Sequence, residues 1–195
     1  MHAKALAAAL TGVAIFAASP ASAQTFPIFK SICLDTQGRR EAALATMDKA
    51  GGWTAVDTSK ASLPPNVKLT DYTVRTHAVG GDVQSIVVGD GSTMTGSGPV
   101  HVEVCMMMGK LDPDAVANAK SWVGAARTMT VAIPANGVNA NMNIFMFKQG
   151  EDGGRTSIDL ASATSGGALK APVTMVITME ASGNNAMLAR MNMKP

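Results

Sequence analysis

Residues 100–108 of this 195-residue chain are Val-His-Val-Glu-Val-Cys-Met-Met-Met. Hydrophobic side chains occupy every second position of this stretch, and His101, Glu103 and Cys105 lie between them. Successive side chains of a β-strand point to opposite faces of a sheet, so the alternation predicts a strand with one buried face. The opposite face would then hold the polar residues together with Cys105.

Further strands are predicted on both sides of this stretch. Residues 72–78 alternate in the same way, Gly80-Gly81-Asp82 has hairpin-turn composition, and residues 83–88 would form the partner strand. The segment 89–98 has four glycines and no hydrophobic period, and we expect a flexible loop there. Later strands are predicted by four alternating sets: Met129, Val131 and Ile133; Met142, Ile144 and Met146; Val173, Met175, Ile177 and Met179; Met187, Ala189, Met191 and Met193.

One helix is predicted before the central strand. Residues 37–50 are rich in Ala, Leu and Met, with Asp35 and Thr36 as candidate N-caps and Gly51-Gly52 at the end. The short apolar segment 24–34 is expected to be a strand or an extended arm.

A second helix is predicted over residues 113–123, with Asp112 as N-cap, Pro113 at the first helical position and Gly124 at the end. The strands alternate rather than run continuously apolar, which favours antiparallel pairing. The expected fold is therefore α+β: a mainly antiparallel β-sheet with two α-helices.

Composition restricts the class of protein. Hydrophobic residues make up 47% of the chain and charged residues 15%, so the chain can bury a sizeable core, and we expect one domain over residues 24–195. A net charge of +2 without a basic stripe, together with 4% aromatic residues, argues against nucleic acid as a partner.

The first 23 residues have the composition of a signal peptide. Lys4 is followed by an apolar run over residues 5–18 and by the small residues Ala21-Ser22-Ala23, a typical cleavage site. The run is shorter than the roughly 20 residues of a membrane span, and no later stretch reaches that length. We expect a cleaved signal peptide, a soluble mature chain without a membrane span, and a periplasmic or secreted location.

Cys33 and Cys105 are the two cysteines of the chain. In an oxidising compartment, such a pair is most simply one disulfide. A disulfide would require the segment that carries Cys33 to cover Cys105. Cys105, however, shares a strand face with polar residues, which are expected to be exposed. Either a bulge breaks the alternation, or this face is partly buried beneath the segment before the first helix.

Methionine is unusually frequent, with 14 residues. We favour a core role for most of them, because Met fills irregular space in a core with few aromatic residues. The alternative is a soft-metal site, in which thioethers and imidazoles bind copper. On the central strand, Met107 points away from the predicted core.

Histidines suggest another alternative. His77 on the hairpin and His101 with Glu103 on the central strand would form a metal or acid/base site if their strands were neighbours. The candidate metal ligands are thus His77, His101, Glu103 and Met107. The simpler interpretation is a solvated sheet face.

The sequence has neither the Gly-x-Ser-x-Gly pattern of serine hydrolases nor the His-Glu-x-x-His pattern of zinc proteases. We therefore expect a non-enzymatic binding or structural protein of the cell envelope or secreted fraction, with no cofactor and an unidentified ligand or envelope partner. The two alternatives are a Met/His copper-binding protein and a small enzyme that uses the His77, His101 and Glu103 face.

Overall fold

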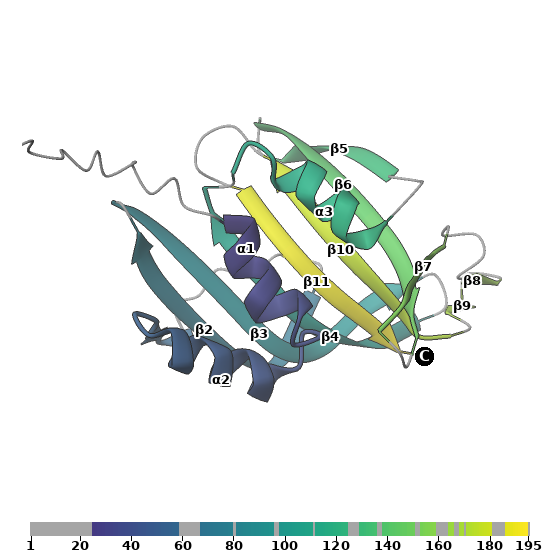
Figure 1. Ribbon diagram of the computed structural model, residues 1–195. Helices are drawn as coiled ribbons and strands as arrows, with labels where there is room; N and C mark the ends of the chain where they lie inside the picture. Colours follow the sequence, from purple (N-terminus) through teal and green to yellow (C-terminus); the bar gives the residue numbers. More distant parts are fainter. Residues whose placement is uncertain are drawn as a thin grey trace, which may run out of the picture.

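The computed structural model describes residues 25–58, 67–79, 81–95, 98–110, 112–124, 129–135, 138–150, 153–158, 164–165, 168–169, 171–180 and 186–194. The predicted signal peptide lies outside these residues. Within them, helices lie against one face of a long, twisted β-sheet (Figure 1).

Nine of the described strands form one sheet in the order β1-β2-β3-β4-β11-β10-β6-β5, with β7 beside β6. All neighbouring strands are antiparallel, which confirms the predicted sheet type. Its strands are β1 (Thr54–Val56), β2 (Val67–Val79), β3 (Asp82–Thr95), β4 (Gly98–Gly109), β5 (Met129–Ala135), β6 (Val138–Gln149), β7 (Arg155–Ser157), β10 (Val173–Glu180) and β11 (Ala186–Lys194). A separate small hairpin consists of β8 (Thr164–Ser165) and β9 (Ala168–Leu169).

The sheet joins two halves of the chain. Strands β1 to β4 follow one another in sequence and in space, and β5, β6, β7, β10 and β11 form the other side. Among the described strands, the two sides pair between β4 and β11, where His101 lies opposite Lys194 and Gly109 lies opposite Ala186. We call this boundary the seam. Residues far apart in sequence thus become neighbours in the middle of the sheet.

The described helices are α1 (Thr25–Phe29), the π-helical turn η1 (Lys30–Leu34), α2 (Arg40–Ala50) and α3 (Ala115–Val123). The expected strand or arm at residues 24–34 is therefore wrong. Phe26, Phe29 and Cys33 are all buried, a spacing that matches one helical face. Pro27 lies in the first turn, where its missing N–H costs no helical hydrogen bond.

The two predicted helices exist but begin later than expected. Helix α2 begins at Arg40 and not at residue 37, because Thr36 donates its hydroxyl to the carbonyl oxygen of Ile32 and so belongs to the end of η1. Asp35 pairs with Lys30 instead of capping α2. Gly51 ends the helix with φ 74°, as predicted.

Asp112 does not cap the helix that follows it. Helix α3 begins at Ala115, and the Asp112 carboxylate instead accepts hydrogen bonds from the backbone N–H of Phe26 at 3.1 Å and from the Thr25 hydroxyl at 3.1 Å. It thereby accepts from one backbone N–H in the first turn of α1. Asp112 is thus a capping residue, but the helix that its side chain caps is α1 and not α3.

The predicted flexible loop over residues 89–98 is wrong for most of its length, because β3 continues to Thr95. A Cβ at Gly89 would lie 2.4 Å from the Cβ of Tyr72, and one at Gly91 would lie 2.1 Å from the carbonyl oxygen of Lys68. These glycines allow β2 to approach β3 closely beside an irregularity in the pairing between Leu69 and Asp71.

Hydrophobic residues fill both faces of the central strands. On one face, Val102, Val104 and Met106 belong to a core with residues of β10 and β11, as the alternation predicts. On the other face, Cys105 and Met107 are fully buried beneath the helices. The second core explains why Cys105 shares a face with polar residues: the helices cover only part of that face.

The predicted disulfide is present. Cys33 of η1 is bonded to Cys105 of β4, with the two Cα atoms 5.4 Å apart, and both residues are fully buried. The bond fixes the helical layer to the sheet next to the seam.

Candidate functional site

A polar network lies on the helix-covered face of β4 and β11, beyond the end of η1. The same residue alternation that buries Cys105 continues along both strands to residues that η1 does not cover. The cross-strand pairs are Arg190 with Cys105, Asn192 with Glu103, and Lys194 with His101. The face thus changes from buried to accessible within a few residues.

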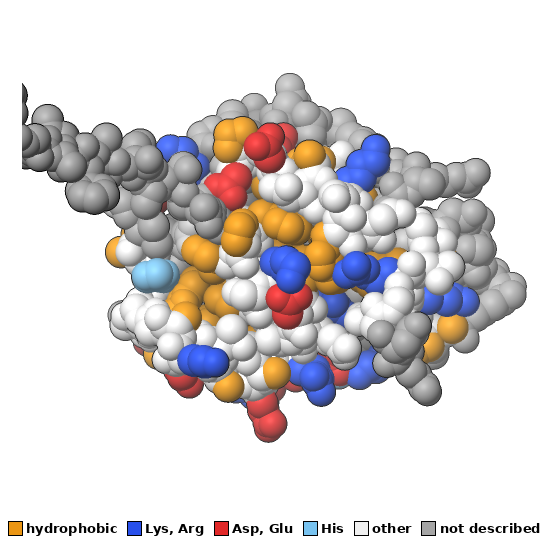
Figure 2. Space-filling view, in the orientation of Figure 1, with side chains coloured by type: hydrophobic (Ala, Val, Ile, Leu, Met, Phe, Trp, Pro, Cys, Tyr) orange, Lys and Arg blue, Asp and Glu red, His pale blue; other side chains and the backbone are white. Residues whose placement is uncertain are grey.

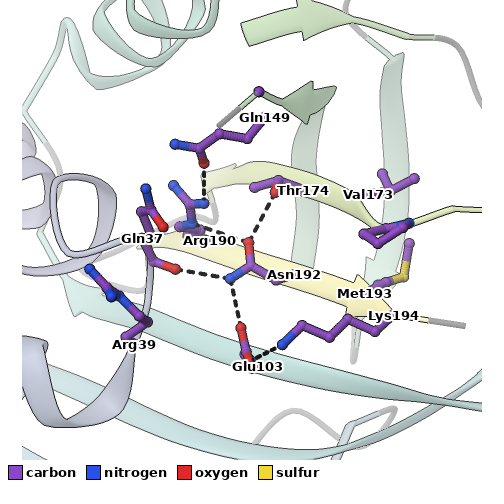
Figure 3. A pocket seen from close by; sticks show the side chains of 12 residues that line it. Gln37, Arg39, Glu103, Gln149, Val173, Thr174, Arg190, Asn192, Met193 and Lys194 are labelled. Atoms are coloured by element: carbon purple, nitrogen blue, oxygen red, sulfur yellow. Dashed lines mark hydrogen bonds and ion pairs between the residues drawn. The ribbon is translucent and has the colours of Figure 1, made fainter. Parts of the chain in front are cut away.

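Asn192 is the centre of this network (Figure 3). Its side-chain oxygen accepts hydrogen bonds from the Thr174 hydroxyl at 3.0 Å and from Arg190 Nε at 3.2 Å. Its amide nitrogen donates to the Gln37 carbonyl oxygen at 2.9 Å and to Glu103 at 3.1 Å. One amide therefore connects β4, β10, β11 and the turn before α2.

Arg190 is 2% exposed. Besides Asn192, its guanidinium donates to the Leu34 carbonyl oxygen at 3.3 Å and to Gln149 Oε1 at 2.7 Å. All three acceptors are neutral, and none of the ion pairs among the described residues includes Arg190. Burial lowers the pKa of Arg190 to about 10, and the nearby charge of Glu103 offsets part of this effect.

Glu103 forms an ion pair with Lys194. Burial of its carboxyl raises the pKa of Glu103, but hydrogen bonds from Lys194 and Asn192 and the positive charge of Lys194 lower it more, so the pKa falls below its ordinary value. Glu103 is therefore held as a carboxylate.

A cavity of about 410 Å³ adjoins the network. Among the described residues that line it, Arg39, Arg190 and Lys194 are cationic and Glu103 is acidic. Polar amides and a hydroxyl complete the wall: Gln37, Gln149, Thr174 and Asn192. The part of the wall that the structure describes therefore has a positive charge balance and many hydrogen-bonding groups.

A second cavity of about 370 Å³ shares Arg39 and Glu103 with the first. Its wall includes Asp71, Asp90 and Glu41, and the charge balance there is acidic. Figure 2 shows the helix-covered face of the molecule, where basic and acidic side chains lie close together among hydrophobic and uncharged ones. Two adjoining hollows of opposite charge thus meet near Glu103.

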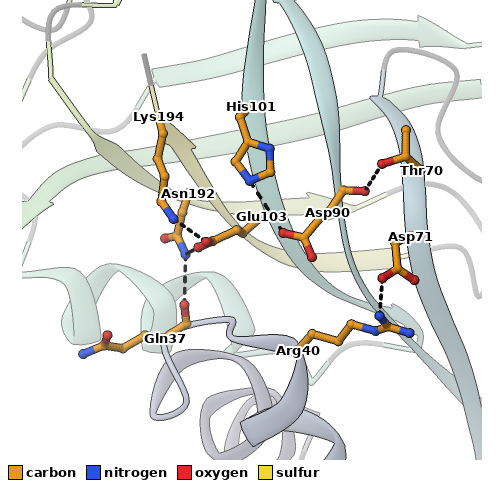
Figure 4. A network of polar contacts seen from close by, with 9 residues as sticks. All are labelled: Gln37, Arg40, Thr70, Asp71, Asp90, His101, Glu103, Asn192 and Lys194. Atoms are coloured by element: carbon orange, nitrogen blue, oxygen red, sulfur yellow. Dashed lines mark hydrogen bonds and ion pairs between the residues drawn. The ribbon is translucent and has the colours of Figure 1, made fainter.

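Two of the predicted metal candidates come together here. Glu103 and His101 lie on the same face of β4, and Asp90 of β3 lies directly opposite Glu103 (Figure 4). Ligand atoms of Asp90, His101 and Glu103 all lie within 4.8 Å of one another, and His101 Nε2 is 3.6 Å from Asp90 Oδ1.

The other two candidates lie elsewhere. His77 is opposite Gln84 on β3, six residues from Asp90, which is roughly 20 Å along a strand. Its ring packs against Trp53 with 5.0 Å between centroids. Met107 is fully buried beneath the helices, six residues along β4 from His101. The structure therefore brings together half of the predicted set and adds Asp90.

The remaining site residues have only weak signals in the sequence. Asp90 lies in the glycine-containing segment that was expected to be a loop. Arg190 and Asn192 occupy the polar positions between the methionines of the final alternating set, so a strand there predicts that they share a face. Their neighbours on β4 follow only from the nonlocal pairing.

Comparisons with protein-family models, with curated proteins and with solved structures find no match to this chain. No helix within the described residues is long and apolar enough to span a membrane.

Proposed function

We propose that this protein is an exported, non-enzymatic binding protein and that the cavity beside Arg190 binds a small molecule through a carboxylate or phosphate group. The observation that supports this most is the buried guanidinium of Arg190, whose partners are all neutral. A buried charge that no opposite charge contacts is costly, by several kcal/mol in general, and the charge of Glu103, which does not contact Arg190, offsets only part of that cost. A bound oxyanion would supply that charge.

Hydrogen-bonding capacity supports the same ligand class. A guanidinium has five N–H groups, and the described partners of Arg190 use three of them. Charge-assisted bonds from a guanidinium to an oxyanion are stronger than bonds to neutral acceptors. Lys194 and Arg39 would add attraction at the accessible rim of the cavity.

The wall of the cavity favours binding over catalysis. Among the described residues that line it there is no His, Cys or Ser, and the groups of Glu103, Lys194 and Thr174, which could serve as a base or a nucleophile, are engaged in an ion pair and a hydrogen bond. The proposed enzyme alternative has little geometric support, since His77 lies far from His101 and Glu103. The copper alternative has similarly little support, since Met107 and Met106 are buried in the two cores.

Export is part of the proposal. The signal-peptide composition of residues 1–23 supports it, and the buried disulfide between Cys33 and Cys105 is typical of proteins outside the reducing cytosol. We propose a periplasmic or secreted location with a mature N-terminus at or near Gln24. N-terminal sequencing of the mature protein tests this, and an intact Met1 form in the membrane fraction would contradict it.

Anion binding is testable by calorimetry and thermal unfolding with phosphate, succinate and citrate, against sodium chloride of equal ionic strength. We expect at least one of the three to bind and to raise the unfolding temperature. Lys194→Gln and Arg39→Gln should each weaken binding about 10-fold, the loss expected for one charge-assisted contact. Lys110→Gln, an exposed lysine outside the cavity, is the matched control. Equal binding by all variants, or no binding at 10 mM, would overturn the proposal.

A further inference from the structure

Asp90 and Glu103 form a cross-strand pair of like charges. They lie directly opposite each other on β3 and β4, where two side chains approach most closely. Such like-charge pairs destabilise a sheet unless an opposite charge lies between or beside them. Lys194 provides one for Glu103, but the partner of Asp90 within the described residues is His101, which is charged only when protonated.

His101 completes a set of metal-binding atoms. It lies two positions before Glu103 and points to the same face, so one imidazole nitrogen faces two carboxylates. The ligand atoms are within 4.8 Å of one another, and small rotations of the exposed Asp90 and His101 side chains would bring them closer. Glu103 keeps lone pairs for a further partner even with Asn192 and Lys194 bound, because a carboxylate has about four acceptor positions.

We propose that Asp90, His101 and Glu103 bind a divalent cation of borderline hardness. Two carboxylates and one imidazole suit Zn²⁺ or Mn²⁺, whereas Cu(I) prefers the thioethers and thiolates that this cluster lacks. Three protein ligands on an accessible face leave coordination positions for water or for a ligand atom. This site shares Glu103 with the proposed anion cavity, whereas Asp90 and His101 are not among the described residues that line that cavity.

Zinc binding by untagged protein is the direct test, measured by competition with a chromogenic chelator and by calorimetry. We expect one Zn²⁺ per chain. His101→Ala and Asp90→Asn should each lower the affinity at least 10-fold, because each removes one of three ligands. His77→Ala and Asp82→Asn are matched controls, since they change the same residue types outside the cluster. Both controls should bind like the unmodified protein.

A second measurement distinguishes the site from a general effect on folding. Without metal, Asp90→Asn should be at least as stable as the unmodified protein at pH 8, because it removes one of two opposed charges. Zinc should raise the unfolding temperature of the unmodified protein and leave that of Asp90→Asn unchanged. The proposal is overturned if Zn²⁺ does not bind at 1 mM, or if His101→Ala keeps full affinity. Phosphate binding that survives in His101→Ala would leave the anion proposal standing on its own.

Discussion

Arg190 of β11 donates a hydrogen bond from Nη1 to the backbone carbonyl oxygen of Leu34 at the end of η1, across 156 residues of sequence. Together with the bond to Gln149 of β6, it joins the helical layer to two strands of the sheet. The same guanidinium that makes the cavity positive thus also holds its wall together.

Replacing Arg190 tests this structural role. Arg190→Met keeps most of the side-chain volume but removes the donor to Gln149 Oε1 and one of the two donors to the Leu34 carbonyl oxygen, which also accepts from the Gln37 N–H. The loss of such a hydrogen bond costs about 1–3 kcal/mol for a buried group. Removal of a desolvated charge offsets part of the loss, so we expect a net destabilisation of about 2 kcal/mol in urea unfolding. Lys148→Met, at an exposed site on β6, should change stability by less than about 0.5 kcal/mol. An equal effect of both variants would contradict the bridging role of Arg190.

The lowered pKa of Glu103 predicts that the folding stability of the protein depends on pH. Its folded-state pKa lies below the ordinary value of 4.5, so the unfolded chain takes up a proton first as the pH falls. The stabilisation is complete above about pH 4.5 and is lost as the pH falls through the lower folded-state pKa. Glu103→Gln should therefore lose less stability than the unmodified protein between pH 6 and pH 3.5 in urea unfolding. Glu180→Gln, at an exposed position, should follow the unmodified protein; parallel curves for all three would argue against this prediction.

Alanine substitutions of the two aspartates before α3, Asp112 and Asp114, should differ in how much stability they cost. Asp112→Ala removes the acceptor for Phe26 N–H at the start of α1 and should cost about 1 kcal/mol, as for other lost caps. Asp114 is the N-cap residue of α3 by position, yet its side chain makes no capping hydrogen bond. Asp114→Ala should therefore cost less than Asp112→Ala in chemical denaturation. The reverse order would show that Asp112 acts on α3 after all.

The disulfide should supply a large part of the stability. It closes a loop with a sequence separation of 72 residues, and its removal should lower the free energy of unfolding by about 2–5 kcal/mol. Guanidinium unfolding with and without reductant measures the difference, and the Cys33→Ser/Cys105→Ser double variant should match the reduced protein. Alkylation of the native protein without reductant should modify neither cysteine, and a modified thiol would contradict the bond.

Gly89 should tolerate no side chain. In Gly89→Ala the new Cβ would meet the Tyr72 Cβ at 2.4 Å and the Asp71 carbonyl oxygen at 2.5 Å, so the backbone of β2 must move. We expect a loss of about 1–3 kcal/mol in thermal or chemical unfolding. Ser92→Ala on the same strand serves as the control and should be nearly neutral. A neutral Gly89→Ala would mean that the two strands do not approach so closely.

Local pattern predicted the strands well because residue alternation is a local property. It placed His101 and Glu103 on one face of β4, and it placed Met106 on the other. It failed at residues 24–34, where the short apolar segment predicts a strand or an extended arm although its Pro27 lies in the first turn of a helix, a position that accepts proline. It failed again at Gly89 and Gly91, because the need for glycine comes from a neighbouring strand and not from a turn.

Only part of the candidate site follows from the sequence, because the remaining contacts depend on which strands pair and not on a local pattern. Which strand lies beside β4 depends on pairing across the seam, and the register that sets Asn192 against Glu103 is not encoded in either segment alone. Likewise, Asp112 has an ordinary capping signal, and only the packing of α1 beside α3 decides which helix it caps.

The seam between β4 and β11 has a consequence for the growing polypeptide. Until residues 186–194 have been synthesised, β4 has no partner on one side, and the backbone N–H and C=O groups of that side form an unpaired edge. Such edges promote association between chains. At ordinary rates of translation, the ribosome needs on the order of ten seconds to make the residues that separate β4 from β11. During that interval the unpaired side of β4 is open to pairing with other chains.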